Sequence, residues 1–217
     1  MSVSWIGFDF DGTFYEFDAV RKFNQELTTK YYEIGRKMDY NREKLDLFKR
    51  SNNEEYVRLS ALAHKMTSKT LLERGAKKGV ARTVNKMAGD YNLYIITNAI
   101  LPSVETGLDA LNIQRTNFEF IIAHGEVYKI GKGRSSWVAH TKLKPDTHSF
   151  NYSAEYSKKH SGIPAAQHVF VGDSETHDIE PARNVGMRAI RAYKKSRYAS
   201  VPWIRNFSDL PQKIRKL

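Results

Sequence analysis

Asp9 and Asp11 are the first residues whose types and spacing could do chemistry. They follow the apolar run Trp5–Phe8, which predicts a short buried strand, and Gly12-Thr13 predicts the turn that ends it. Alternation along the strand points both carboxylates the same way and turns Phe10 toward the core. Two like charges on one side repel unless a cation, a proton or a ligand relieves them. The alternative is a turn that happens to contain two aspartates.

Further polar groups stand at comparable places later in the chain. Thr97-Asn98 follows the predicted strand 91–96, and Gly172-Asp173-Ser174 follows the predicted strand 168–171. In an open parallel sheet, ligands bind at the carboxyl ends of the strands. Lys144 precedes Pro145 in a basic stretch of the chain. These positions are therefore candidates for one shared site with the two aspartates.

The four stretches, in this order, resemble the four motifs of the haloacid dehalogenase-like (HAD) phosphatases. The matches are Asp9-x-Asp11-Gly12-Thr13, Thr97 at a strand end, Lys144-Pro145 with Phe150 behind it, and Gly172-Asp173-Ser174 with Asp178. Each match alone is a short motif, whereas all four in order are a specific signal. The resemblance covers residues 3 to about 190, apart from a helical insert and the stretch 125–143.

The resemblance implies a role for each matching residue. Asp9 is the expected nucleophile, which forms an aspartyl-phosphate, and Asp11 is the expected general acid and base. The expected ligands of Mg²⁺ are Asp9, Asp173 and the main-chain carbonyl of Asp11, with Asp178 in support. The groups expected to bind the phosphoryl oxygens are Gly12, Thr97, the backbone N–H of Asn98, and Lys144.

Several of these residues also have plain structural interpretations. Thr97 could only cap a strand end, Asp178 could be a helix N-cap, and Lys144 could be one more member of a basic loop. Lys142 competes for the lysine role, although only Lys144 precedes a proline. His177 lies beside Asp178, but no pair of histidines has metal-ligand spacing, so we expect it to be solvated.

The elements that must position these residues indicate an α/β fold, a Rossmann-like parallel sheet with helices on both faces. Between the first and second motifs the pattern is helical, which predicts a small all-helical cap over residues 15–80 inserted in a core of residues 1–14 and 81–217. Apolar residues at helical spacing mark the first helix, which Gly35 is expected to end: Val20, Phe23, Leu27, Tyr31 and Ile34. Ser51 with Glu54 predicts a capping box for a third helix that runs to Gly75.

Helix and strand patterns alternate again after Gly79. We expect helices at 80–88, from Pro102 to 111, at 147–160 and at 178–184, and strands at 118–122 and 187–190. Residues 125–144 are basic and contain several glycines, and we assign them as a loop with room for a short hairpin.

The composition places further bounds on the protein. The chain has no cysteine, which excludes disulfides and thiolate chemistry and fits a cytoplasmic location, and no apolar run could span a bilayer. The net charge is +11; residues 187–217 contain nine Lys and Arg against one Asp, and residues 128–144 contain five with no acid. Such a field attracts anionic substrates, although a solvated basic surface is the alternative. A monomer and a homodimer are both compatible with these features.

The expected function is Mg²⁺-dependent hydrolysis of a small phosphate monoester, of the sugar phosphate, phosphoglycolate or nucleotide type. Asp11 argues against haloacid dehalogenation, because that reaction has no leaving oxygen to protonate. A phosphomutase using the same site is one alternative. A nucleic-acid-binding or partner-binding protein is another, since Tyr193, Tyr198 and Trp203 lie among the cations of the carboxyl-terminal segment.

Overall fold

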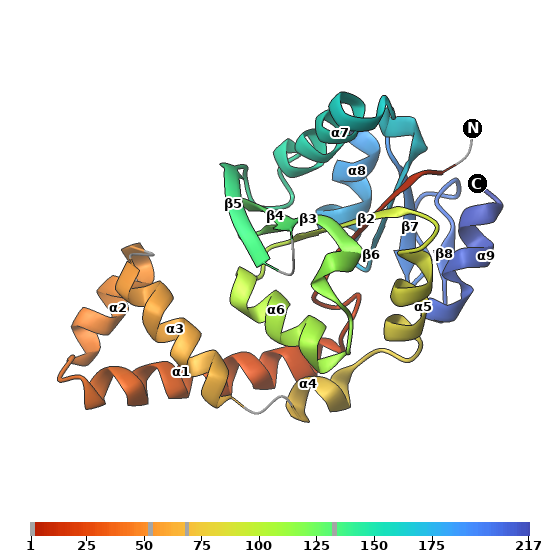
Figure 1. Cartoon of the computed structure of the whole chain (residues 1–217). Helices are drawn as coiled ribbons and strands as arrows, with labels where there is room; N and C mark the ends of the chain where they lie inside the picture. Colours follow the sequence, from red (N-terminus) through yellow and green to blue (C-terminus); the bar gives the residue numbers. More distant parts are fainter. Residues whose placement is uncertain (1–2, 52–53, 68–69, 132–133) are drawn as a thin grey trace.

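A mixed, mainly parallel sheet forms the centre of the computed structural model, which describes residues 3–51, 54–67, 70–131 and 134–217 (Figure 1). Within these residues the strand order is β5-β4-β3-β2-β1-β6-β7-β8. The strands are β1 (Trp5–Phe8), β2 (Asn92–Thr97), β3 (Phe118–Ala123), β4 (Glu126–Gly131), β5 (Arg134–His140), β6 (His168–Gly172), β7 (Arg188–Ala192) and β8 (Trp203–Ile204). Neighbouring strands in the series β3-β2-β1-β6-β7-β8 are parallel, and β4 and β5 are antiparallel additions at one edge.

Helices cover both faces of the sheet, which confirms the predicted α/β class (Figure 1). On one face lie α5 (Val80–Met87), α6 (Leu101–Ala110) and α9 (Leu210–Arg215), and on the other α7 (His148–Ser161) and α8 (Glu180–Asn184). Alternation along β1 sends Ile6 and Phe8 into one apolar core and Trp5 into the other. Because both faces of the sheet are covered, its central strands are apolar throughout.

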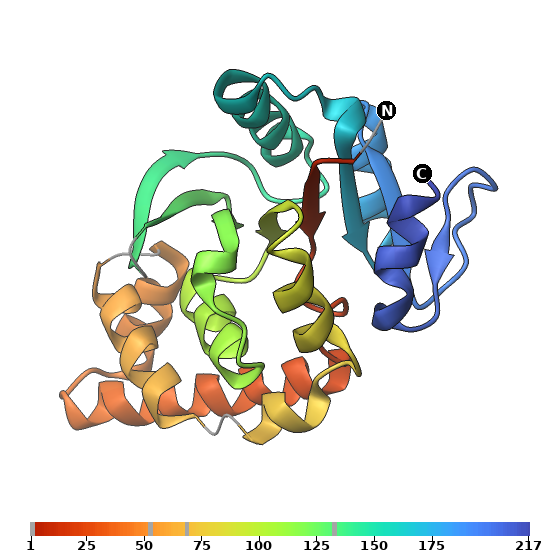
Figure 2. The ribbon, with the colours of Figure 1, turned by 45° about the vertical axis from the view of Figure 1, so that its right-hand side comes forward.

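The chain between β1 and α5 is helical. Its described helices are α1 (Phe17–Lys37), α2 (Arg42–Ser51), α3 (Glu54–Met66) and α4 (Thr70–Gly75), and residues 15–79, to which they belong, are called the helical insert (Figure 2). The far part of the insert has its own apolar cluster, which includes Tyr31, Leu45 and Leu59, whereas Val20 and Phe23 at its near end join the main core. Among the described residues, no helix is long and apolar enough to cross a membrane.

The insert departs from the prediction in two places. Helix α1 continues through Gly35 to Lys37, so Gly35 does not end it; an added Cβ there would lie 2.4 Å from Leu45 Cδ2, and glycine is needed for this close packing. The third helix is divided into α3 and α4 rather than continuous to Gly75. The predicted capping box falls partly outside the described residues, and Ser51 is the last residue of α2.

Within the stretch assigned as a loop with room for a short hairpin, residues 126–131 and 134–140 form the strands β4 and β5. These strands pair with each other and extend the sheet at one edge, so the hairpin that the prediction allowed is present. On β4, Val127 is buried and Lys129 is exposed, although residues two apart on a strand share one face. The hairpin is therefore only partly buried, and its polar and basic composition resembles that of a loop.

His168 is a buried histidine at the start of β6. Its ring stacks on Trp5 with centroids 5.6 Å apart, its Nδ1 lies 3.3 Å from Tyr94 Oη, and its Nε2 lies 2.6 Å from Ser157 Oγ. Burial lowers the pKa of His168 to about 4. The folded protein therefore holds this ring neutral over a pH range in which the unfolded chain, with a pKa of about 6.5, takes up a proton.

We predict that His168 makes the protein less stable as pH falls from about 6.5 toward 4. By linkage, this one group removes about 2 kcal/mol from the free energy of unfolding between pH 7.5 and pH 5. Urea unfolding of wild type and His168→Gln at the two pH values checks this, with the exposed His177→Gln as the matched control. The wild type should lose about 2 kcal/mol more than His168→Gln; equal losses would contradict the assignment.

Candidate active site

The site lies at the carboxyl ends of three neighbouring parallel strands. Asp9 follows β1, Thr97 ends β2, and Asp173 follows β6, and these strands are adjacent in the order β2-β1-β6. The backbone N–H of Asp9 donates to the carbonyl of Val171 on β6 at 2.9 Å, so the sheet pairing continues to the first residue of the site. The sheet thus brings together residues that are far apart in sequence, at the edge where ligands bind in such folds.

The turn after β1 is built around Asp9 and Gly12. Phe10 is buried as predicted, and Thr13 Oγ1 donates to Asp9 Oδ2 at 2.8 Å. Gly12 has a φ of 82°, and a Cβ placed on it would lie 2.7 Å from Asp173 Oδ1. Because a side chain would be strained and would strike the neighbouring carboxylate, glycine is required for Asp9 and Asp173 to come this close.

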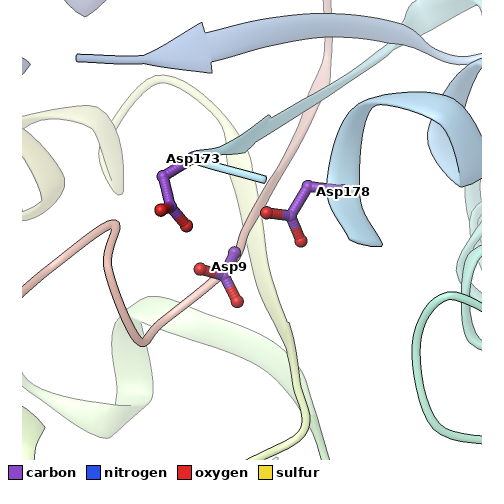
Figure 3. Close-up of side chains that lie close together, drawn as sticks. All are labelled: Asp9, Asp173 and Asp178. Atoms are coloured by element: carbon purple, nitrogen blue, oxygen red, sulfur yellow. The ribbon is translucent and has the colours of Figure 1, made fainter. Parts of the chain in front are cut away.

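Asp9, Asp173 and Asp178 converge on one point (Figure 3). One carboxylate oxygen of each lies within 4.8 Å of the others, and Asp9 and Asp178 are buried. Asp178 Oδ2 accepts the backbone N–H of Ser174 at 2.9 Å, which fixes the turn between β6 and the single π-helical turn Glu175–Ile179. The side chain of Asp11 is not part of this group of three; the metal ligand expected of Asp11 is its main-chain carbonyl.

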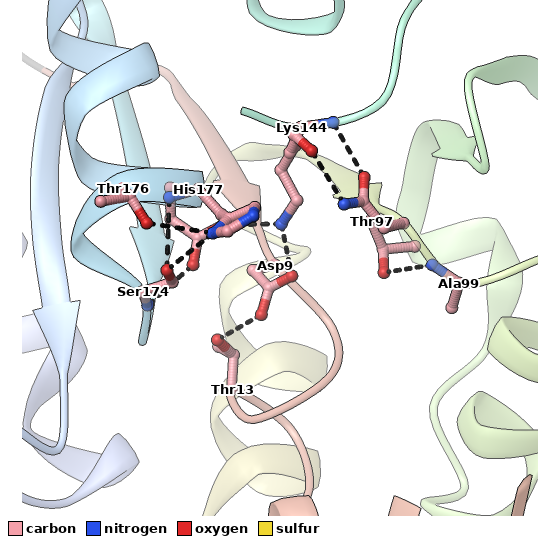
Figure 4. Close-up of polar contacts among 10 residues, drawn as sticks. Asp9, Thr13, Thr97, Ala99, Lys144, Ser174, Thr176 and His177 are labelled. Atoms are coloured by element: carbon pink, nitrogen blue, oxygen red, sulfur yellow. Dashed lines mark hydrogen bonds and ion pairs between the residues drawn. The ribbon is translucent and has the colours of Figure 1, made fainter. Parts of the chain in front are cut away.

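Lys144 supplies the positive charge between two of these acids (Figure 4). Its Nζ donates to Asp9 Oδ1 and to Asp178 Oδ1, both at 2.6 Å, and the side chain is buried. Lys142, the competing candidate, is exposed and lies 3.5 Å from Asp146. Of the two lysines, the structure therefore brings only Lys144 to the carboxylate cluster.

Asn98 holds the main chain of Lys144 in place. Its side-chain amide donates to the carbonyl of Lys144 at 3.0 Å and accepts the backbone N–H of Lys144 at 2.8 Å. The predicted role of Asn98 was limited to its backbone N–H and did not include this contact. The one sequence signal for it is the type of residue, because an asparagine side chain can pair with both polar groups of a peptide.

The remaining candidate residues are Thr97 and His177. Thr97 is buried, and its Oγ1 accepts the backbone N–H of Ala99 at 3.1 Å, which leaves its hydroxyl hydrogen to donate elsewhere. The strand-end contact expected if Thr97 has a purely structural role is therefore present. His177 is exposed and contacts Ser174 and Thr176, as expected of a solvated histidine (Figure 4).

Burial and mutual repulsion raise the pKa values of the acids in the site. Burial, and next the charge of Asp178, raise the pKa of Asp9 to about 6, while burial and the charge of Asp9 raise that of Asp11 to about 7. Burial also raises the pKa values of Asp173 and Asp178. Burial alone would lower the pKa of Lys144, but the charges of Asp178 and Asp9 offset it and raise that pKa. The site therefore contains more negative charge than Lys144 balances.

The residues present fit a hard divalent cation. When ionised, three carboxylates against one ammonium leave a formal charge of −2 at a site whose converging donors are all oxygen. Mg²⁺ prefers carboxylate oxygens and water and seldom needs a complete protein cage. Asp9, Asp173 and Asp178 are the described side chains that can hold it.

A cavity of about 410 Å³ opens beside the cluster. The residues that line it include Asp11 and Asn98 from the site and Phe23, Leu27 and Tyr31 from the helical insert. Its size is that of a small-molecule site, and Asp11 links it to the carboxylate cluster. Tyr15, at the start of the insert, also lines this cavity.

The family follows from a match along most of the chain. The sequence profile of the haloacid dehalogenase-like hydrolases matches residues 6–192. The chain belongs to this family and is a hydrolase, as the motif resemblance predicted. No curated protein matches the sequence.

Solved structures share the fold at low sequence identity. A structure of YfnB from Bacillus subtilis, determined with bound magnesium, has a TM-score of 0.61 at 18% identity and covers 99% of this chain and 100% of its own. A 2-haloacid dehalogenase from Pseudomonas syringae has a TM-score of 0.61 at 19% identity, with 99% of both chains covered. An HAD phosphatase from Thermococcus onnurineus has 0.58 at 20% identity, covering 99% of this chain and 98% of its own. At these identities the likeness defines the fold.

We predict that Lys144→Gln destabilises the protein strongly in the absence of metal. Removing one partner of a buried ion pair leaves uncompensated buried charge, which here should cost about 3 kcal/mol or more of the free energy of unfolding. Lys142→Gln, at an exposed position, should cost less than about 0.5 kcal/mol. Urea unfolding in EDTA measures both. Similar values for the two variants would show that Lys144 does not hold the carboxylates together.

Proposed function

We propose that the protein hydrolyses a phosphate monoester through an aspartyl-phosphate on Asp9, with Mg²⁺ as cofactor and Asp11 as general acid and base. The observation that carries this proposal is the position of Asp11. Its carboxyl group has a pKa raised to about 7, lies two residues from Asp9, and lines the cavity where a leaving group would sit. An acid of that pKa can both give and take a proton near neutral pH.

In the first step, a carboxylate oxygen of Asp9 attacks phosphorus, and the bond from phosphorus to the ester oxygen breaks as Asp11 protonates that oxygen. In the second step, a water molecule attacks the same phosphorus and gives a proton to Asp11. The bond between phosphorus and Asp9 breaks, which releases phosphate and restores the Asp9 carboxylate. Thr97, Lys144 and the backbone N–H groups at Gly12 and Asn98 hold the phosphoryl oxygens. Asp9, Asp173 and the carbonyl of Asp11, with Asp178 close by, would hold Mg²⁺, which would neutralise charge on the phosphoryl group.

In this proposal residues 15–80 act as a cap on a core of residues 1–14 and 81–217. Support comes from the separate apolar cluster of the insert and from the paired ends by which it leaves the core. Tyr15 bridges Ala76, Glu16 N–H donates to the Gly75 carbonyl at 2.7 Å, and Lys77 N–H donates to the Phe14 carbonyl at 2.9 Å. Paired ends of this kind are a natural hinge for a cap that excludes water from the site.

Two other activities are weaker candidates on this site. Haloacid dehalogenation needs no proton for a leaving oxygen, so it leaves Asp11 without a purpose. A phosphomutase would use the same residues and differ in what accepts the phosphoryl group.

Nucleic-acid binding by the carboxyl-terminal segment is disfavoured by the packing of its aromatic residues: Tyr193 Oη donates to the Thr13 carbonyl, and Tyr198 stacks with Arg183 and Arg197.

We predict that the purified protein releases p-nitrophenol from p-nitrophenyl phosphate with Mg²⁺ and not in EDTA. Asp9→Asn should lower kcat by on the order of 10⁴-fold or more, as when other covalent nucleophiles are removed. Asp11→Asn should lower it by on the order of 10²-fold or more, because the attacking water then has no base.

The exposed Asp90→Asn is the matched control for these variants and should keep wild-type turnover. Halide release from chloropropionic acid is measured in parallel and should be absent. Metal-independent turnover, turnover by Asp9→Asn at the wild-type rate, or halide release without phosphatase activity would each contradict the proposal.

A further inference from the structure

The cavity beside Asp11 has walls that are mainly apolar and aromatic. Its volume is about 410 Å³, far more than the phosphoryl group alone requires, so the walls must contact the leaving group. The apolar and aromatic side chains on these walls include Phe10, Tyr15, Val20, Phe23, Leu27 and Leu72. Most of them belong to the helical insert, and Phe10 comes from the turn that carries Asp9.

Two tyrosines of this wall, Tyr15 and Tyr31, direct their hydroxyl groups to carbonyls of the protein. Tyr15 Oη donates to the carbonyl of Gly107, and Tyr31 Oη donates to the carbonyl of Leu45 at 2.9 Å. Tyr31 also packs against Tyr56 with ring centroids 5.6 Å apart, and Tyr15 against Phe10 at 5.5 Å. Both rings are buried, so the wall offers a ligand the small part of each ring surface that faces the cavity, and ring surface favours another ring in an offset or edge-to-face arrangement.

Charge in the cavity disfavours an anionic leaving group. Among the described residues that line it, Lys49 is the one with a permanent positive charge, and its side chain is exposed and hydrated. A carboxylate on the leaving group of the substrate would lose water among Phe23 and Leu27 and would lie near Asp11. Burying an unpaired anion is costly, so the protein's net charge of +11 does not make this cavity a carboxylate site.

We propose that the substrate is a phosphate monoester whose leaving alcohol is uncharged and carries an aromatic or heteroaromatic ring. The ring lies in this cavity against the apolar and aromatic side chains of its wall, and the amide of Asn24 and the hydroxyl oxygen of Thr28 on the same wall serve its polar substituents. This inference rests on the proposed phosphatase function. It selects ring-bearing esters over phosphoglycolate and simple sugar phosphates.

Matched pairs of esters with the same type of leaving oxygen test it. 2-Phenylethyl phosphate is compared with ethyl phosphate, uridine 5′-monophosphate with ribose 5-phosphate, and phosphoglycolate serves as the anionic probe. Burial of one ring predicts a kcat/KM about tenfold or more higher for the ring-bearing member of a pair. A gain in the first pair alone identifies a carbocyclic ring, and a gain in the second pair alone identifies a base. Equal kcat/KM within both pairs, or a preference for phosphoglycolate, would overturn the inference while the phosphatase function stands.

Leu27→Lys adds a cation to the apolar wall, and Leu47→Lys makes the same change at an exposed position of the insert that does not line the cavity. Leu27→Lys should lower the ratio of kcat/KM for 2-phenylethyl phosphate to that for phosphoglycolate by about tenfold or more. Leu47→Lys should leave the ratio unchanged, and an unchanged ratio in Leu27→Lys would contradict the assignment.

Binding of the non-hydrolysable 2-phenylethylphosphonate and ethylphosphonate, measured by calorimetry with Mg²⁺, separates this inference from the proposed function. Tighter binding of the phenyl compound, weakened by Leu27→Lys, supports the ring site even if no ester is hydrolysed; that result would contradict only the phosphatase proposal. Equal binding of the two phosphonates would overturn the ring site whatever the turnover.

Discussion

The ammonium group of Lys144, between Asp9 and Asp178, is the interaction on which the site depends. Carboxylates that share a buried space lose water and repel one another, and burial first and repulsion second raise the pKa values of Asp9 and Asp178. Lys144 offsets part of it through two contacts of 2.6 Å, and the excess negative charge that remains suits a divalent cation. The same charges that make this cluster costly to fold thus make it able to bind a metal and a phosphoryl group.

The fold is arranged so that this cluster can form. Its acids come from the ends of β1 and β6, and the main chain of Lys144 is held by the side chain of Asn98 at the end of β2. Glycine at position 12 allows the turn after β1 to approach Asp173. The helical insert departs from the α/β core directly after that turn, so any movement at its paired ends would act close to Asp9 and Asp11.

Much of this could be predicted from local sequence patterns, because those patterns report on single strands and turns. The α/β class, the central strands and the family all followed from apolar runs and from the motifs that end them. The strands at 126–131 and 134–140 were allowed for as a short hairpin but not assigned, because a half-exposed hairpin at the sheet edge is as basic and polar as a loop. Gly35 was misread because its small size serves packing against Leu45, a contact that helix periodicity does not encode.

Contacts between distant segments were the hardest to predict. Asn98 and Lys144 are 46 residues apart, and only the folded sheet brings that amide to that peptide. The lining of the cavity by both the insert and the core is likewise a property of tertiary packing, since the period of α1 gives its apolar stripe but not what the stripe faces.

The central claim is that Asp9 receives the phosphoryl group, and a single-turnover experiment with Asp11→Asn tests it most directly. p-Nitrophenolate leaves without needing a proton, so this variant should complete the first step and stall at the second. The account predicts a burst of p-nitrophenol equal to the enzyme present, together with a phosphoryl adduct that peptide mass spectrometry places on Asp9 and that hydroxylamine removes. A burst with Asp9 unmodified, or an adduct on another residue, would contradict it.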